Sequence, residues 1–103
     1  MPYYVLFYDV VDDYVTRRAP FRQEHLKLAA DAHARGEIVM GGAFADPANK
    51  VLIVFRGEDR SVAESFARKD PYVINGLVTR WEVRPWTVVI GGADTVPPAA
   101  PKP

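Results

Sequence analysis

The residues best suited to chemistry are one histidine and one aspartate that lie far apart in the chain. His25 falls on the apolar arc of a segment with helical periodicity, and Asp70 lies where a second predicted helix ends. Imidazole titrates near neutral pH, and a carboxylate bound to one ring nitrogen fixes its tautomer and raises its basicity. If both helices pack on one face of a sheet, Asp70 can reach His25. The sequence therefore contains a possible acid–base pair.

A structural interpretation of the same two residues stays open. His25 would be a core histidine bonded to a backbone carbonyl, and Asp70 a turn residue before Pro71. Structural pairs also perturb ionisation, so residue types alone do not separate the two interpretations. Spacing by itself favours the structural one.

Arg22 lies about one helical turn before His25, where a guanidinium could stabilise negative charge on an enolate or phenolate. The guanidinium groups of Arg17 and Arg18 could also bind an anion, but we favour a solvated basic patch there. Several other residues have simple interpretations as packing or helix-end residues: Tyr72 and Trp81 in the core or a dimer contact, and His33 near a helix end.

Several kinds of site are absent from the sequence. There are no cysteines, which excludes thiolate metal sites and cysteine nucleophiles. His25 and His33 are two turns apart on one helix, about 12 Å along its axis, so they cannot share one metal ion. Neither a phosphate-binding glycine loop nor a serine-nucleophile motif is present. We therefore expect no metal and no cofactor.

Charge and hydropathy narrow the class of protein. Lys and Arg total 13 and Asp and Glu total 13, and this zero net charge argues against nucleic-acid binding. A hydrophobic fraction of 49% and a charged fraction of 25% are typical of a globular domain. Apolar runs are too short to cross a membrane, and the N-terminus lacks the pattern of a signal peptide. We expect a cytoplasmic protein with no membrane contact.

The order of predicted elements is strand, helix, strand, strand, helix, strand. The ranges are strands over 3–10, 37–40, 51–55 and 77–86, a helix over 20–35 that ends at Gly36, and a second helix from Ser61 to Asp70 with a capping box of Ser61 and Glu64. This order predicts an α+β, ferredoxin-like βαββαβ domain over residues 1–90, with a four-stranded antiparallel sheet and two helices on one face. Residues 91–103 are predicted to be a mobile Pro/Ala-rich tail.

The second sheet face needs a cover because its strands carry tyrosine, phenylalanine and leucine. We expect a second copy of the chain in a twofold contact, which is the commonest arrangement of homo-oligomers.

The pattern Arg18-x3-Arg22-x2-His25-Leu26-x-Leu28 is followed by Gly36-x5-Gly42-Ala43-Phe44, Asp70-Pro71-Tyr72-Val73 and Glu82-Val83-Arg84-Pro85-Trp86. Together, these motifs resemble the YCII-related (YciI-like) family over about residues 3–88. Ala43 departs from the usual proline. The resemblance implies a dimeric α+β barrel whose active site is built on His25 and Asp70. One branch of the family acts as a dehydrochlorinase on chlorinated hydroxyhydroquinones.

With the resemblance included, the enzymatic interpretation is favoured. The hypothesis is a cofactor-independent enzyme of lyase or isomerase type that acts on a small cyclic or aromatic hydroxylated compound. His25 and Asp70 would be catalytic, and Arg22 and Tyr72 would bind the substrate. The alternative is a non-catalytic dimeric protein that binds a small ligand or serves as an accessory protein.

Overall fold

The computed structural model describes residues 1–92 of the chain. Its elements in order are β1 (Tyr3–Val10), α1 (Tyr14–Arg17), η1 (Ala19–Phe21), α2 (Arg22–Ala34), β2 (Ile38–Ala43), β3 (Lys50–Arg56), α3 (Ser61–Lys69), α4 (Pro71–Ile74) and β4 (Val78–Trp86). The predicted tail falls outside the described residues except for Gly91 and Gly92.

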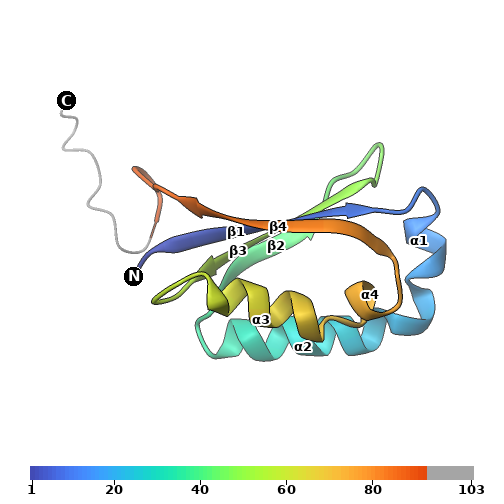
Figure 1. Cartoon of the computed structure of the whole chain (residues 1–103), viewed down its shortest axis with the longest axis horizontal. Coiled ribbons are helices and arrows are strands. Elements are labelled where there is room, and N and C mark those ends of the chain that lie inside the picture. The colour runs from blue at the N-terminus through green and yellow to red at the C-terminus, as the bar shows by residue number, and fades with distance from the viewer. Residues whose placement is uncertain (93–103) are drawn as a thin grey trace.

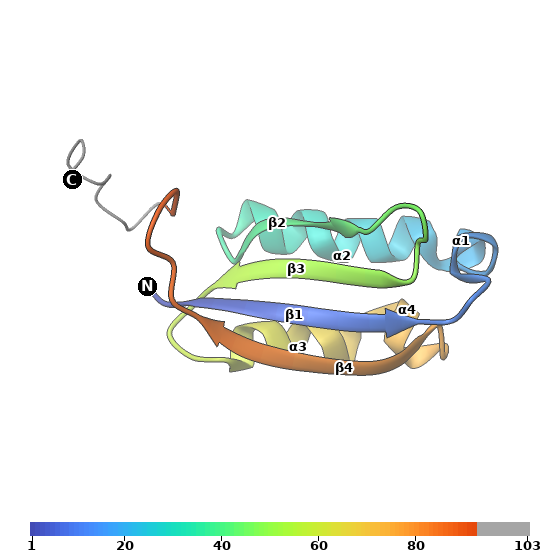
Figure 2. The ribbon, with the colours of Figure 1, turned by 90° about the horizontal axis from the view of Figure 1, so that it is seen from above.

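The strands form one antiparallel sheet in the order β2-β3-β1-β4. In this part of the chain the helices lie together on one face of the sheet (Figure 1). The view onto the opposite face shows the strands in front with the helices behind them (Figure 2). The predicted α+β ferredoxin-like fold is therefore confirmed.

The core lies between the sheet and the helices. Leu6 and Tyr8 on β1 and Phe55 on β3 are almost fully buried there. They occupy alternate positions of their strands, as expected when one face of each strand is covered. From the helix side, Phe66 of α3 and Ala32 of α2 pack against them.

The first long helix differs from its prediction at the start. A 3-10 turn occupies Ala19–Phe21, and α2 begins at Arg22. Its end agrees, because Gly36 adopts the left-handed conformation (φ +81°) that commonly follows a helix. Helical periodicity places Leu26 on the same apolar arc as His25, which is predicted to face the core, but Leu26 is 46% exposed. The apolar arc is wider than the strip of α2 that contacts the sheet, and Leu26 lies on its rim.

Other local predictions were wrong for identifiable reasons. The short helix α1 was predicted as a connector. The Ser61 side chain does not cap α3; instead, Asp59 Oδ1 accepts a hydrogen bond from the Ser61 amide at 2.9 Å. Simple alternation along the last strand would place Val78 and Val83 on opposite faces of the sheet, but the register shifts between Asp9 and Val10, and both residues are buried in the core.

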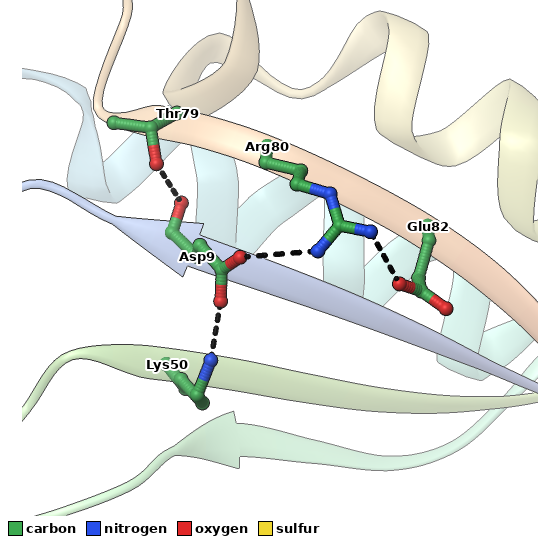
Figure 3. Close-up of polar contacts among 5 residues, drawn as sticks. All are labelled: Asp9, Lys50, Thr79, Arg80 and Glu82. Carbon is green, nitrogen blue, oxygen red and sulfur yellow. Dashed lines mark hydrogen bonds and ion pairs between the residues drawn. The ribbon is translucent and has the colours of Figure 1, made fainter.

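The sheet face away from the helices has an apolar part and a charged end. Apolar residues on this face include Val5, Phe7, Leu52, Val54 and Trp86. At the charged end, Asp9 contacts Lys50 and Arg80, and Arg80 also bonds Glu82 (Figure 3). The hydrogen bond from Lys50 is the main cause of a lowered pKa for Asp9.

No helix within residues 1–92 is both long and apolar enough to cross a membrane.

Candidate functional site

Asp70 is a fully buried carboxylate at the junction of α3 and α4. Pro71 excludes the helical conformation at the preceding residue, and Asp70 is extended (φ −69°, ψ 121°). That conformation makes Asp70 the N-cap of α4, and its Oδ1 accepts a hydrogen bond from the Tyr72 amide at 3.0 Å. The end of the helix that was predicted at Asp70 therefore also turns the Asp70 side chain into the interior.

A tyrosine from the middle of the sheet binds the second carboxylate oxygen. The Tyr8 hydroxyl on β1 donates to Asp70 Oδ2 at 2.7 Å. Burial, and then the negative charge of Asp70, raise the pKa of Tyr8. The phenol therefore remains protonated and acts as a donor to Asp70 at neutral pH.

His25 contacts the same carboxylate from α2. Its Nδ1 lies 2.8 Å from Asp70 Oδ1, and its side chain is 12% exposed. The structure therefore brings together the two residues that the sequence singled out. Because a carboxylate accepts hydrogen bonds and donates none, Nδ1 is the donor in this contact, and Nε2 is the ring nitrogen that is left for another partner.

Aromatic rings hold the imidazole in place. Tyr72 stacks on His25 with a centroid separation of 3.8 Å and an interplanar angle of 8°. Phe66 of α3 meets the His25 ring edge-on, with centroids 6.4 Å apart. Contacts in two directions, together with the bond to Asp70, restrict rotation of the imidazole, so that Nε2 has a fixed direction.

A cavity of about 560 Å³ lies beside His25, between α2 and β2. The cavity exists because the residues that line it on both elements are small. They are Ala29 and Ala30 on the helix and Gly41, Gly42 and Ala43 on the strand. A Cβ at Gly41 would lie 3.2 Å from the Ile53 side chain, so any residue larger than glycine would crowd the cavity lining at this position.

The two predicted substrate-binding residues, Arg22 and Tyr72, line this cavity, and so does Arg18. Arg18 was interpreted as part of a solvated patch, but its guanidinium lies 5.1 Å from the centroid of the Tyr14 ring at the cavity wall. Arg17 does belong to the surface, where it pairs with Asp13 at 3.9 Å.

The remaining candidates have varied positions. His33 is exposed and lies in the last turn of α2, as predicted, and it also lines the cavity. Trp81 packs against the core, and Arg68 lies 5.6 Å from its ring centroid. Tyr8 was not singled out at all, since a strand tyrosine carries no sequence signal for its distant partner. Among residues 1–92, no three His, Asp or Glu side chains are arranged to hold a metal ion.

Solved structures with this fold include proteins of different description. One is the 5-chloro-2-hydroxyhydroquinone dehydrochlorinase of Burkholderia phenoliruptrix AC1100, solved in complex with 2,5-dihydroxybenzoquinone. It is 17% identical with a TM-score of 0.70, and the match covers 82% of this chain and 93% of the dehydrochlorinase chain. An uncharacterised NIPSNAP-like domain protein of Burkholderia xenovorans is 15% identical with a TM-score of 0.59, and the match covers 93% of this chain and 91% of that protein. An antibiotic biosynthesis monooxygenase is 12% identical with a TM-score of 0.53, covering 87% and 100%. At these identities the likeness shows the fold alone.

No match was found among curated proteins. The family model of the YCII-related domain, however, matches residues 1–87. This match covers all the helices and strands described above, so the chain belongs to the YCII-related domain family.

Proposed function

We propose that the protein is a cofactor-independent acid–base enzyme that acts on a small, cyclic or aromatic, hydroxylated compound. The observation that carries this proposal is the contact of His25 Nδ1 with the buried carboxylate of Asp70, beside a cavity. A buried carboxylate stabilises the imidazolium that forms when Nε2 takes up a proton. His25 is the catalytic residue of this proposal, and Asp70 positions it.

The chemistry that fits best is elimination of a proton and a halide from a ring. His25 Nε2 takes a proton from the substrate, electrons shift into the ring, and chloride leaves with its bonding pair, so that the elements of HCl are lost. A base of this kind needs no redox partner. The dehydrochlorinase that shares the fold is a precedent for this reaction class, at 17% identity.

The test measures turnover with chlorinated hydroxyhydroquinones, following chloride release and loss of the ring absorbance. We expect His25→Gln to lower kcat at least 100-fold, the usual contribution of a general base. Asp70→Asn should lower kcat as well. Asp31→Asn is the matched control, because Asp31 is an exposed carboxylate on the same helix as His25 and does not line this cavity.

His25→Gln keeps the test decisive if Asp70→Asn fails to fold, because His25 is partly exposed. Full chloride release by His25→Gln would contradict the proposal. Binding of these compounds by the wild-type protein without any conversion over hours would contradict it too, and would favour the alternative, a non-catalytic ligand-binding or accessory protein.

The proposal includes a homodimer in the cytoplasm. On the sheet face that carries no helix, Phe7 is 37% exposed and Trp86 is 52% exposed, whereas Val5 and Val54 on the same face are already buried within the chain. Removing exposed apolar surface of this kind from water stabilises an assembly. A second copy packed through the same face would supply that cover, as the family resemblance also implies.

A further inference from the structure

The charges around the cavity point to the chemical class of its ligand. We propose that the cavity beside His25 selects anionic ligands, with a carboxylate or ionised hydroxyl bound by Arg18 and Arg22 and a second oxygen bound by the Tyr72 hydroxyl. This inference rests on the proposed function for the role of the site, but it is a statement about binding and can be tested without turnover.

The first observation is the sign of the charge at the cavity wall. The lining residues include Arg18, Arg22, His25 and His33, and no aspartate or glutamate. The one carboxylate nearby, Asp70, is fully buried behind His25 and engaged by donors. A ligand in the cavity therefore meets positive charge and no opposing negative charge.

The second observation is that these two arginines lack acidic partners within the described residues. Most other arginines of this region form ion pairs, such as Arg17 with Asp13 and Arg35 with Glu37. Arg18 and Arg22 make no such pair, and Arg18 lies over the Tyr14 ring instead. A planar guanidinium matches a carboxylate or phenolate oxygen and can bind it with two parallel hydrogen bonds.

The third observation is a buried polar atom without a partner. Tyr72 is 1% exposed and lines the cavity, yet its hydroxyl makes no hydrogen bond within residues 1–92. An unsatisfied buried hydroxyl costs free energy and is uncommon in folded proteins. Hydrogen bonding to a ligand oxygen would remove this cost.

The arginines and the tyrosine act on one another. Burial raises the pKa of Tyr72, whereas the positive charges of Arg22 and Arg18 lower it. Because Arg18, Arg22 and Tyr72 also line one cavity, a single ligand can lie among all three. A cavity of about 560 Å³ is within the usual range for small-molecule sites, and a single substituted ring fits it.

The test compares two probes that differ in charge but little in shape. Salicylate is anionic at neutral pH, and salicylamide is its neutral counterpart. Dissociation constants are measured by titration calorimetry at low and at physiological salt. We expect salicylate to bind the wild-type protein at least about tenfold more tightly, with the preference shrinking as salt rises.

Variants of the cavity residues show which side chains cause the preference for salicylate over salicylamide. Arg18→Gln and Arg22→Gln should each reduce the preference for salicylate, and the double variant should bring it close to one. Tyr72→Phe should weaken both probes by about three- to tenfold, because each offers an oxygen to the lost hydroxyl. Arg17→Gln is the control, since Arg17 is the neighbour of Arg18 but pairs with Asp13 and does not line the cavity.

Equal binding of the two probes would overturn the inference. So would failure of both to bind at millimolar concentration, or a preference for salicylate that survives in the double arginine variant. The outcome is separate from the proposed function. A preference for salicylate in a protein that converts no substrate leaves the inference intact and refutes the enzyme, and turnover without any preference does the reverse.

Discussion

Asp70 is a charged group that the interior tolerates only because donors surround it. Its two oxygens face the Tyr8 hydroxyl, the Tyr72 amide and His25 Nδ1. Burial of a carboxylate without such partners would cost several kcal/mol. The contact between Asp70 and His25 also places the imidazole, so the stability of the fold and the proposed proton transfer would depend on one small group of residues.

Tyr8 and Tyr72 provide opposite tests of this arrangement. Tyr8→Phe removes a donor to the buried carboxylate and should destabilise the fold by about 1–3 kcal/mol. Tyr72→Phe removes a hydroxyl that has no partner and should leave the stability unchanged or slightly increased. Urea unfolding, with linear extrapolation to water, measures both free energies.

Tyr4→Phe is the control for Tyr8→Phe, because the Tyr4 hydroxyl on the same strand contacts no carboxylate among the described residues. If Tyr8→Phe proved as stable as Tyr4→Phe, the bond from Tyr8 to Asp70 would not contribute to stability.

At the level of single residues, the sequence revealed part of the site. The residue types, the helical arc and the Asp-Pro break singled out His25 and Asp70 as candidates, but only the family resemblance favoured the acid–base interpretation over the structural one. Tyr8 could not, because it is one of several tyrosines in an apolar strand and its partner is 62 positions away. Arg18 was underrated, since sequence alone does not show which basic residues face a cavity and lack acidic partners.

The ends of elements decide where these side chains point. The break between α3 and α4 at Asp70 and Pro71 turns the carboxylate inward, and the end of α2 at Gly36 sets the connection to β2. The helices and strands were predicted well because their apolar periodicity is strong. The N-terminal cap of α3 was not, because Ser61 and Asp59 offer similar capping groups two residues apart and only the backbone path selects between them.

Gly36 is the element-level test. Its φ of +81° suits glycine, and a Cβ would find no steric neighbour within 4 Å. Gly36→Ala should therefore cost about 1–2 kcal/mol through backbone strain alone. Gly42→Ala is the matched control, because a Cβ at Gly42 also enters open space but the backbone there has no positive φ. The free energy of unfolding of this variant should change by less than about 0.5 kcal/mol. Thermal and urea unfolding compare the two, and equal stabilities would contradict the role of Gly36.

At the scale of the whole domain, the helices of residues 1–92 form one layer on one side of the sheet, and none of them covers the other side (Figure 1). The order of elements and the alternation of apolar residues predicted this layering, because a βαββαβ chain with short connections has few compact arrangements. The sequence could also show that the second face carries large apolar residues. Within residues 1–92, Phe7 and Trp86 on this face are 37% and 52% exposed, so what covers them is a prediction.

Association through the open face is the prediction at this scale. We expect a dimer at micromolar concentration by size-exclusion chromatography with light scattering. Phe7→Glu, on the open face and 37% exposed, should shift the protein toward monomer by placing charge in the contact. Ile74→Glu, an exposed apolar residue on α4, is the control and should leave the dimer intact. A wild-type monomer at these concentrations would contradict the dimer.

Nitrogen-15 NMR of the His25 side chain tests the proposed proton-transferring pair directly, because it needs no known substrate. We predict that the neutral ring carries its proton on Nδ1, held by Asp70, and that the Nε2 resonance responds when salicylate is added. A proton found on Nε2 with Nδ1 free, or a His25 ring that does not respond to any ligand of the cavity, would contradict a proton-transferring pair at this site.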